Sequence, residues 1–294
     1  MQRKKPEPVA TAMPEIRAGQ SIELLKALHI LTVEGKMNQD SRRKLKQVYH
    51  LVQFIEPLLA QVLAERGSVT LVDHGAGKSY LGFILYDVFF KAIAVQYPAN
   101  KVWGIETRAP LVAGAIRLAE QLGFSQMAFL NESVAEAITT EKLPPQIDVV
   151  TALHACDTAT DDALRFGLEK KAKFIVVVPC CQAEVAAHLR NEKGETTASK
   201  CISELWRHPI HTREFGSQIT NVLRCLLLEA NGYKVTVTEL VGWEHSMKNE
   251  LIIAQFKNLP RKAAMERLQQ VLDTFGLQRM SERFGAQGRR MVPT

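Results

Sequence analysis

Short apolar runs alternate with segments of helical periodicity through the middle of the chain. The runs end in turn residues, as in "VTLVDHG" at 69–75, and this pattern is typical of buried strands. We expect five such strands, the fourth together with its exit loop, at residues 69–75, 101–107, 127–131, 146–157 and 173–181. This alternation of strands and helices predicts a doubly wound, mostly parallel sheet.

Two helices are expected before the first strand, at residues 21–33 and 40–65. Asp40 or Ser41 is the expected N-cap of the second helix, because short polar side chains accept the first free backbone N–H groups. Gly67 is its expected end.

Two apolar segments near the end of the chain, 233–243 and 250–256, are joined by only a few residues. So short a link cannot contain a parallel crossover, and we therefore expect an antiparallel pair. Residues 208–218 are expected to lie before a helix, where they could form a lid. The predicted fold is thus an α/β, Rossmann-like doubly wound sheet that ends in an antiparallel hairpin, with N-terminal helices.

This pattern divides the chain into four parts. Residues 1–19 contain three prolines and few large apolar side chains, which predicts a disordered tail. The remaining parts are an N-terminal helical segment at 20–67, a cofactor-binding domain at 68–257, and a C-terminal helix with a basic tail at 258–294.

Composition narrows the class of protein. A hydrophobic content of 46% and a charged content of 23% are ordinary for a globular protein. The apolar run 81–95 contains Asp87 and Lys91, so we interpret it as part of a buried helix from about Lys78 to Gln96 and expect no membrane span. The first residues lack an apolar signal core, and five cysteines form an odd set, so we expect a reducing, cytoplasmic location.

Charge is distributed unevenly along the chain. Residues 1–50 carry ten Lys and Arg against five Asp and Glu, and residues 257–294 carry eight against three. Basic flanks of this kind either contact a polyanion such as RNA or form a solvated surface. RNA is therefore the candidate partner, and the sequence leaves the oligomeric state open.

The stretch "DHGAGKSYLG" at 73–82 contains a glycine-rich turn directly after the first strand. A P-loop would need a glycine at position 72, which is Val72. A dinucleotide fingerprint would need a third glycine at position 80, which is Tyr80. The turn therefore fits neither a nucleoside triphosphate nor NAD.

S-adenosylmethionine has no phosphate and requires a different set of groups. It needs backbone that approaches closely at a glycine turn, and an acid at the end of the next strand for its ribose hydroxyls. Asp73 can meet its ammonium group, directly or through water, and Glu106 can accept both hydroxyl hydrogen bonds. The sequence therefore favours S-adenosylmethionine as the cofactor.

Parallel sheets bind ligands at the carboxyl ends of their strands. That rule selects the residues after each predicted strand, including 74–78, 131–133 and 154–157. The predicted cofactor-binding residues are Asp73, Gly75, Ala76, Gly77, Tyr80, Glu106, Asn131, Glu132 and Leu153.

Four segments together carry a family resemblance: "VDHGAGKSYL", "GIE", "LHACDTATDDAL" and "VVVPCC". They resemble a methyltransferase family with a Leu-His-Ala-Cys-Asp/Gly motif and a Pro-Cys-Cys motif. The family includes human methyltransferase-like proteins and the methyltransferase part of the glutathione S-transferase C-terminal-domain-containing protein. Eukaryotic tRNA ribose-methylating enzymes carry a related histidine–cysteine stretch. The resemblance covers about residues 40–257 and implies a class I methyltransferase fold that binds S-adenosylmethionine at Asp73, Gly75, Gly77 and Glu106.

Methyl transfer is an in-line displacement that requires a positioned nucleophile and sometimes a base. The predicted catalytic residues are His154, Asp157 and Cys180. His154 either acts as the base or hydrogen-bonds the backbone and shapes the cofactor pocket. Cys180 and Cys181 are either small buried residues of a tight loop, thiolates that contact the substrate, or metal ligands with Cys156 and His154. We predict no metal site.

The helical stretch "SRRKLKQVYH" at 41–50 is rich in positive charge. Its cations are the predicted substrate-binding residues, namely Arg42, Arg43, Lys44 and Lys46. The alternative is the charged outer face of an amphipathic helix. We therefore expect a methyltransferase that acts on RNA (tRNA or rRNA). The alternatives are a protein or small-molecule methyltransferase, and a catalytically silent binding scaffold with the same fold.

Overall fold

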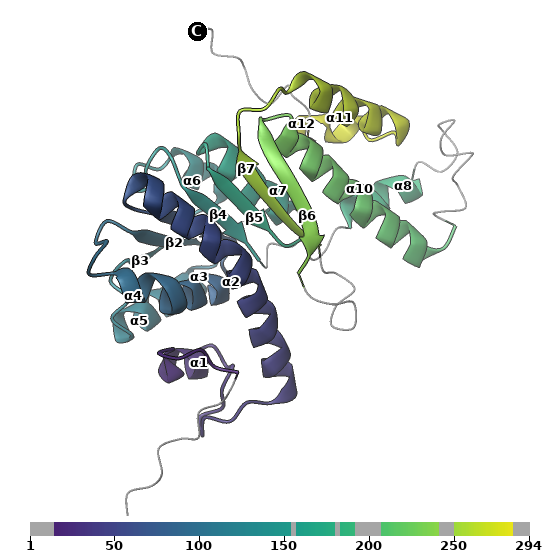
Figure 1. Ribbon diagram of the computed structural model, residues 1–294. Helices are drawn as coiled ribbons and strands as arrows, with labels where there is room; N and C mark the ends of the chain where they lie inside the picture. Colours follow the sequence, from purple (N-terminus) through teal and green to yellow (C-terminus); the bar gives the residue numbers. More distant parts are fainter. Residues whose placement is uncertain (1–14, 154–156, 180–182, 192–206, 241–249, 285–294) are drawn as a thin grey trace, which may run out of the picture.

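The computed structural model describes residues 15–153, 157–179, 183–191, 207–240 and 250–284. These residues form one seven-stranded sheet with helices on both faces (Figure 1). The strand order is β3-β2-β1-β4-β5-β7-β6. The strands are β1 (Thr70–His74), β2 (Lys101–Ile105), β3 (Met127–Leu130), β4 (Val149–Ala152), β5 (Phe174–Val177), β6 (Tyr233–Glu239) and β7 (Glu250–Phe256).

The sheet is parallel from β1 to β5, and β7 runs antiparallel to both of its neighbours. The five strands and the terminal hairpin expected from the sequence are therefore confirmed, with ends that differ by a few residues. This order and these directions define a doubly wound α/β sheet whose last two strands form an antiparallel hairpin.

Helices connect the strands and cover the sheet. The long helices are α2 (Gln39–Arg66), α5 (Ala109–Gln121), α7 (Thr158–Glu169), α10 (Pro209–Glu229) and α11 (Lys262–Thr274). The shorter ones are α1 (Ile22–Ala27), α3 (Tyr80–Leu85), the π-helical turn η1 (Tyr86–Phe90), α4 (Lys91–Ile93), α6 (Val134–Thr139), α8 (Glu184–Asn191), the 3-10 turn η3 (Gln278–Met280) and α12 (Ser281–Phe284).

The central strands are buried on both faces. Leu71 of β1 and Val149 of β4 belong to one apolar cluster, with side chains of α1, α2, α3 and α5. Their neighbours Val72 and Val150 belong to a second cluster, with α6 and α7. Successive side chains of a strand point to opposite faces, so burial on both sides requires nearly continuous apolar runs. Polar chemistry is therefore displaced to the ends of these strands.

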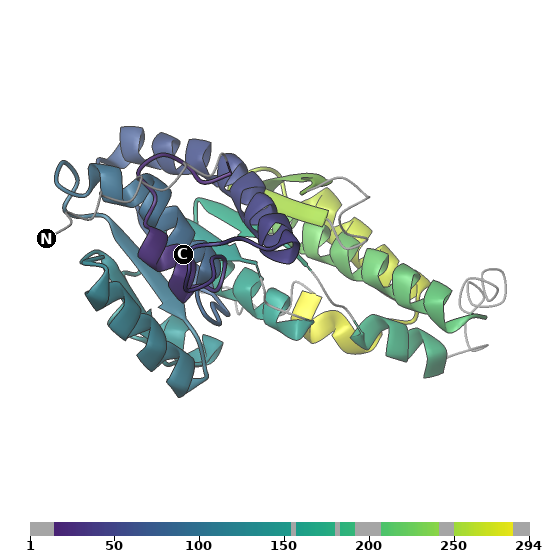
Figure 2. The same cartoon turned by 90° about the horizontal axis from the view of Figure 1, so that it is seen from below.

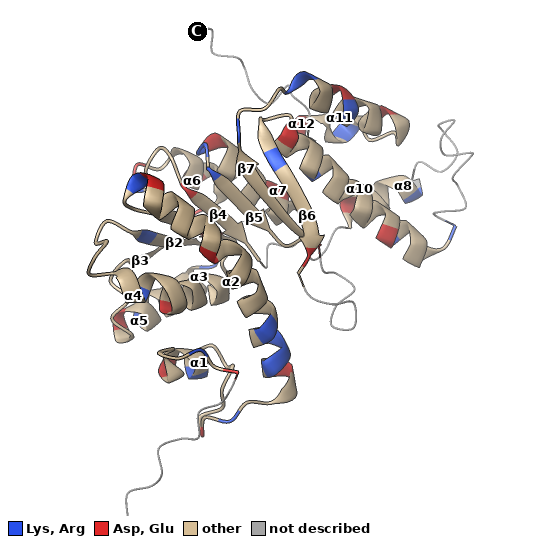
Figure 3. Cartoon of the chain, in the orientation of Figure 1, with Lys and Arg blue, Asp and Glu red and all other residues tan. Residues whose placement is uncertain are grey.

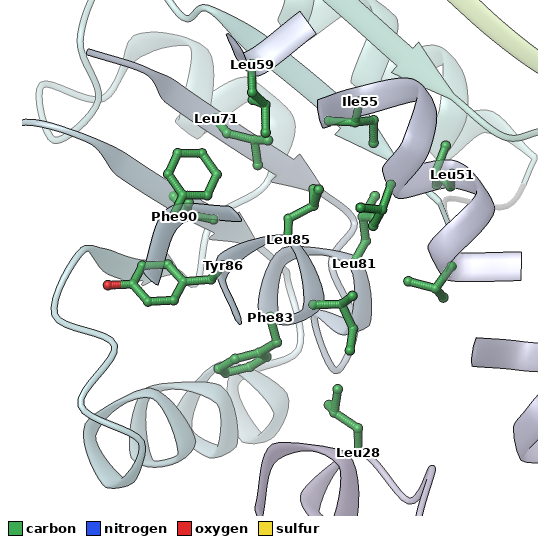
Figure 4. Close-up of a cluster of buried hydrophobic side chains, with 14 of the residues drawn as sticks. Leu28, Leu51, Ile55, Leu59, Leu71, Leu81, Phe83, Leu85, Tyr86 and Phe90 are labelled. Carbon is green, nitrogen blue, oxygen red and sulfur yellow. The ribbon is translucent and has the colours of Figure 1, made fainter. Parts of the chain in front are cut away.

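Helix α2 is the largest element of the first face. Its stripe of Leu51, Ile55 and Leu59 packs with Leu71 of β1 and Leu85 of α3 (Figure 4). Stripes of this kind supply most of the stability of an amphipathic helix in a protein.

The two ends of α2 compare differently with the sequence analysis. Gly67 adopts the left-handed conformation at the C-cap (φ +73°), so the expected end is confirmed. The expected cap at Asp40 or Ser41 is wrong. Asn38 caps the helix instead, and its side chain accepts from the N–H of Ser41 (2.8 Å). The helix begins at Gln39, so both expected caps lie inside its first turn.

The single helix expected from about Lys78 to Gln96 is also corrected. The glycine turn extends through Ser79, so α3 begins only at Tyr80. A π-helical turn, η1, then separates α3 from α4. Apolar periodicity alone does not distinguish a π turn from an α-helix, since the two differ by one residue per turn.

The expected position of residues 208–218 before a helix is wrong. His208 is the N-cap of α10 and Pro209 its first residue, so the stretch forms the first three turns of that helix. Proline is well suited to this position, because the first helical N–H groups have no partner within the helix. Helix α10 packs with α8, α11 and α12 around a third apolar cluster (Figure 2).

No helix within the described residues is long and apolar enough to cross a membrane.

Candidate functional site

The loop after β1 is a tight turn in left-handed backbone. Gly75 has φ +63° and Gly77 has φ +57°, values that glycine adopts without steric cost. Ser79 follows with φ +53°. The N–H of Ala76 donates to the carbonyl of Ile105 in β2 (3.0 Å), which fixes the turn to the neighbouring strand. The turn therefore presents rigid backbone that a ligand can approach closely.

Glu106, directly after β2, organises the polar contacts beside this turn. Its Oε2 accepts from the N–H of Gly77 (2.8 Å). The Arg108 guanidinium donates to both carboxylate oxygens (2.9 and 3.0 Å), and the Arg108 N–H donates to Oε1 (3.0 Å). The side-chain hydrogen bonds from Arg108 hold the pKa of Glu106 at about 2. The carboxylate is therefore ionised at neutral pH and faces the glycine turn.

Arg108 and Glu106 differ in exposure. The Glu106 side chain is 8% exposed, whereas that of Arg108 is 66% exposed. An ion pair with one solvated partner contributes little to stability and exchanges readily. The guanidinium can therefore leave the carboxylate when another donor arrives.

Asn131 supports Glu106 from the end of β3. Its Nδ2 donates to the carbonyls of Glu106 (2.9 Å) and Thr107 (2.8 Å). The structure therefore gives Asn131 a positioning contact on the backbone that carries the acid. Direct contact of Asn131 with the cofactor stays a prediction.

A cavity of about 500 Å³ opens beside Glu106, and we call it the edge cavity. It lies at the carboxyl ends of β1 and β2, against the first residues of α6 and α7. Ligands bind doubly wound sheets at this edge. The predicted cofactor residues Gly75, Glu106 and Glu132 line the edge cavity together with His74, Arg108 and Arg165.

Asp73 lies within the sheet, 3% exposed, and does not line the edge cavity. Its Oδ1 accepts from the Thr151 hydroxyl of β4 (2.9 Å). Burial raises the pKa of Asp73 to about 7, against the lowering effect of hydrogen bonds from Thr151 and the Gly82 backbone. A cationic group beside Asp73 would favour the ionised form.

The remaining predicted cofactor residues have other neighbours. The Tyr80 hydroxyl donates to the carbonyl of Leu28 in the N-terminal segment. Leu153, directly after β4, is partly buried against the first apolar cluster. These interactions do not decide whether Tyr80 and Leu153 contact the cofactor, and that contact stays a prediction.

Asp157 is the only predicted catalytic residue within the described part of the chain, since His154 and Cys180 lie outside it. It has φ +51° and ψ −120°, a strained backbone for a residue other than glycine. Its carboxylate accepts from the N–H of Ala183, which follows β5 (3.2 Å). Asp157 thus joins the segments that follow β4 and β5. The three readings of the cysteine pair Cys180 and Cys181 also concern residues outside the described part.

Arg224 of α10 stabilises the strained backbone of Asp157 through a hydrogen bond. It is fully buried, and its Nη2 donates to the carbonyl of Asp157 (2.8 Å). Its Nε donates to Asp161 in α7 (2.6 Å), and its Nη1 donates to Asn221 (3.1 Å). A buried guanidinium is tolerated only with such complete pairing. Helix α10 therefore fixes the backbone at the start of α7.

The predicted substrate-binding cations lie on the first turns of α2, and all four are exposed. Figure 3 shows them as a blue group on that helix. Arg42 and Lys46 line a second cavity of about 520 Å³, the α2 groove, with Glu15, Tyr49, His50 and Gln53. The Arg42 Nε lies 3.3 Å from the Glu15 Oε1. Both side chains are exposed, so this ion pair contributes little to stability. Arg43 and Lys44 do not line the groove.

Two hydrogen bonds connect the α2 groove to the glycine turn. The Ser41 hydroxyl of α2 donates to the carbonyl of His29 (3.4 Å). The adjacent carbonyl, that of Leu28, accepts from Tyr80 at the start of α3. Leu28 also packs near Leu81 (Figure 4). The basic end of α2 therefore lies at the same edge of the sheet as the glycine turn (Figure 1).

Comparison with known proteins gives a family match, similar curated proteins and similar solved structures. A family model described as a methyltransferase domain matches residues 43–188. The mouse glutathione S-transferase C-terminal domain-containing protein is 30% identical over 238 residues, which cover 75% of this chain and 34% of that protein. The Drosophila melanogaster homolog is 23% identical over 219 residues, which cover 66% of this chain and 34% of that protein.

Among solved structures, the DszA carbon methyltransferase is similar with a TM-score of 0.45 at 16% identity. The match covers 82% of this chain and 59% of that one.

The strand order and the terminal hairpin are those of a class I methyltransferase fold, and the family match identifies a methyltransferase domain over residues 43–188. The chain is also similar to the glutathione S-transferase C-terminal domain-containing proteins, and it spans about a third of the length of these curated relatives. The family resemblance carried by the motifs is thereby confirmed.

Sequence reasoning gave no role to three residues that shape the site. His74 belongs to the segment selected by the strand-end rule, but the sequence around it does not show that the imidazole is buried. Arg224 had a signal, because it is the one charged residue in the apolar helical stretch "NVLRCLLL" at 221–228. Arg108 had none, since its pairing with Glu106 depends on the local turn.

Asp73 predicts a pH-dependent stability in the absence of cofactor. Its folded pKa of about 7 exceeds its ordinary value of 3.8, so the native state keeps a proton that the unfolded chain releases. Stability is then full below pH ~4 and falls as the pH rises to ~7, by up to about 1.4 kcal/mol per pH unit. Urea unfolding of the wild type and of Asp73→Asn between pH 5 and pH 8 measures this effect. The advantage of the Asn variant should grow up to pH 7 and then level off; a constant difference contradicts the assignment.

Arg224→Met should destabilise the protein by about 3–5 kcal/mol, because it leaves the buried Asp161 carboxylate without its principal partner. Thermal and urea unfolding measure the loss. The double variant Arg224→Met/Asp161→Leu is the matched control, since it removes both charges, and it should recover most of the stability. A double variant no more stable than the single one would show that the loss comes from packing.

Proposed function

We propose that this chain transfers a methyl group from S-adenosylmethionine to RNA. The observation that carries the cofactor part is the ionised carboxylate of Glu106, held against the N–H of Gly77 beside the edge cavity. The cofactor supplies a methyl group on a positively charged sulfur. The groups present suit it, because the site combines acidic side chains with bare glycine backbone and offers no phosphate-binding turn.

Each acidic group has a distinct task in this proposal. Glu106 accepts hydrogen bonds from the two ribose hydroxyls, for which the exposed Arg108 guanidinium gives way. Asp73, buried behind the turn with its raised pKa, stabilises the ammonium end of the cofactor through the electrostatic field of its carboxylate. Asn131 keeps the backbone of Glu106 in place.

Asp157 acts as a positioning residue rather than as a base. Its carboxylate is engaged by the N–H of Ala183, and its carbonyl by Arg224. Both contacts stabilise the segments after β4 and β5, which carry the other predicted catalytic residues, His154 and Cys180. We retain His154 as the candidate base, since its imidazole is suited to proton transfer near neutral pH.

The α2 groove supports RNA as the substrate. It combines two cations, Arg42 and Lys46, with the rings of Tyr49 and His50. Cations that contact phosphates and rings that stack on bases are the two elements of single-strand nucleic-acid sites. A groove of about 520 Å³ is also large enough for a nucleotide unit.

Glu106→Gln should weaken the binding of S-adenosylhomocysteine about 10- to 100-fold, because hydrogen bonds to a charged acceptor contribute ~1.5–3 kcal/mol. Isothermal titration calorimetry measures the dissociation constant. Arg108→Ala is the matched control: it removes the neighbouring charge but leaves the carboxylate, so it should bind at least as tightly as the wild type. Wild-type affinity in Glu106→Gln would overturn the ribose assignment.

The double variant Arg42→Glu/Lys46→Glu should weaken RNA binding by about tenfold or more and reduce the slope of log affinity against log salt by ~1–2. Fluorescence anisotropy with a labelled single-stranded RNA measures both quantities. The control is Lys257→Glu/Lys262→Glu, which changes the net charge equally at exposed sites near α11, far from the groove (Figure 3). Equal losses of RNA affinity in the two variants would show that only the net charge matters and would contradict a specific role of the groove.

Transfer of label from the cofactor then separates the substrate classes. Labelled RNA supports the proposal. Labelled protein with unlabelled RNA would favour the protein-methylating alternative, and cofactor binding without transfer to either would favour the scaffold.

A further inference from the structure

Arg283 of α12 connects the first turns of two other helices. Its Nη2 donates to Oε1 of Glu184 in α8 (3.1 Å), and its Nη1 donates to Oε2 of the same carboxylate. The Nη1 group also donates to Oδ2 of Asp161 in α7 (3.4 Å). Helix α7 begins after β4, and helix α8 begins after β5. One side chain of α12 therefore links the elements that follow two neighbouring strands of the sheet.

Asp161 is shared between two arginines. Its Oδ1 accepts from Nε of Arg224 (2.6 Å), and its Oδ2 accepts from Arg283. The Asp161 side chain is 6% exposed, and two cations around one buried carboxylate would leave an excess of positive charge. The second carboxylate, that of Glu184, balances this charge. We call the four residues Asp161, Glu184, Arg224 and Arg283 the arginine clamp.

Asn221 extends the arginine clamp to the terminal hairpin. Its Oδ1 accepts from Nη1 of Arg224 (3.1 Å), and its Nδ2 donates to the carboxylate of Glu250 (2.7 Å). Glu250 is the first residue of β7, which follows β6 in the chain. One polar network therefore joins the starts of α7, α8 and β7, the elements that follow β4, β5 and β6.

The arginine clamp lies apart from the predicted cofactor contacts. None of its four residues lines the edge cavity. Its neighbours are instead Asp157, whose carbonyl accepts from Arg224 (2.8 Å), and Ala183, which precedes Glu184. The N–H of Ala183 donates to the carboxylate of Asp157 (3.2 Å). The clamp therefore supports this contact from both sides, through α7 and through α8.

The two arginines of the clamp differ in exposure. The Arg224 side chain is 0% exposed and belongs to the core, whereas that of Arg283 is 34% exposed. We propose that Arg283 is a positioning residue for methyl transfer. By joining Glu184 to Asp161, it holds the segments after β4 and β5 against each other. This role rests on the proposed function, which places the candidate base in the segment after β4. Displacement of a reacting group by about 1 Å can slow a reaction up to 100-fold.

Arg283→Met tests the proposal by separating chemistry from cofactor binding. The initial rate of label transfer to total RNA at saturating S-adenosylmethionine should fall about tenfold, because the two segments lose their common partner. The dissociation constant of S-adenosylhomocysteine should not change, since the clamp does not line the edge cavity. Scintillation counting and titration calorimetry measure the two quantities. An unchanged rate would overturn the proposal.

Arg267→Met is the matched control. Arg267 of α11 pairs with Glu229 at the end of α10 (2.6 Å), and both side chains are partly exposed, as in the pair of Arg283 and Glu184. The two substitutions should therefore lower the melting temperature by similar, small amounts. Only Arg283→Met should lower the rate. Equal losses of rate in the two variants would assign Arg283 a merely structural role and overturn the proposal.

A double-mutant cycle tests the route through α8. Glu184→Gln removes the charge that Arg283 contacts, so it should also slow label transfer. If the two side chains act through each other, Arg283→Met/Glu184→Gln should be little slower than the slower single variant. Multiplicative losses of rate would contradict this route and overturn the proposal.

Hydrogen exchange tests the clamp without any acceptor. In Arg283→Met, amides in peptides that cover residues 157–162 and 184–191 should exchange about tenfold faster than in the wild type, whereas those in 70–82 should not change. Unchanged exchange at 157–162 and 184–191 would overturn the proposal. Failure of the wild type to label RNA would instead overturn the proposed function, so the two failures are distinguishable.

Discussion

Burial of the central strands on both faces is the constraint from which the arrangement of the site follows. Strands β1, β4 and β5 lie between two apolar layers, so their interior positions are mostly apolar, and the buried pair of Asp73 and Thr151 satisfies its polar groups with a mutual hydrogen bond. Most polar groups lie near the strand ends, and because the strands are parallel, those ends meet at one edge. The glycine turn, Glu106 and Glu132 belong to three different strand ends, yet all three contribute to one cavity.

Helix α10, which packs outside the sheet, stabilises the same edge of the sheet at the start of α7. The start of α7 is strained at Asp157, and a strained residue persists only where its surroundings fix it. Arg224 supplies that fixation from α10, together with its pairing to Asp161. The C-terminal helices therefore contribute to the geometry of the segments after β4 and β5, although they lie outside the family-matched region at 43–188.

Much of the architecture could be predicted because it depends on short-range patterns. Apolar runs gave the strands, the short link gave the hairpin, and Gly67 gave a helix end. The sequence does not distinguish between structural alternatives that differ by only a few residues. Asn38 caps α2 in place of Asp40 or Ser41, and the π-helical turn η1 interrupts the single helix expected from about Lys78 to Gln96. In the site, Glu106 was accessible from its position after a strand. Its neighbour Arg108 pairs with it only because the local turn brings the two side chains together, which the residue order does not reveal. The pair Arg224–Asp161, whose residues are 63 positions apart, depends on a tertiary contact that no local pattern contains.

The hydrogen bond from Tyr80 to Leu28 has a thermodynamic consequence. Tyr80 follows the glycine turn, and the Leu28 carbonyl that it contacts is adjacent to the His29 carbonyl, which accepts from Ser41 in the first turn of α2. A ligand that tightened the turn would therefore act through these contacts on the N-terminal segment beside the α2 groove. Binding free energies at two coupled sites are reciprocal, so occupancy of the groove would raise the affinity for the cofactor by the same factor as the cofactor raises affinity in the groove. Coupling of this kind favours the ternary complex over either binary one.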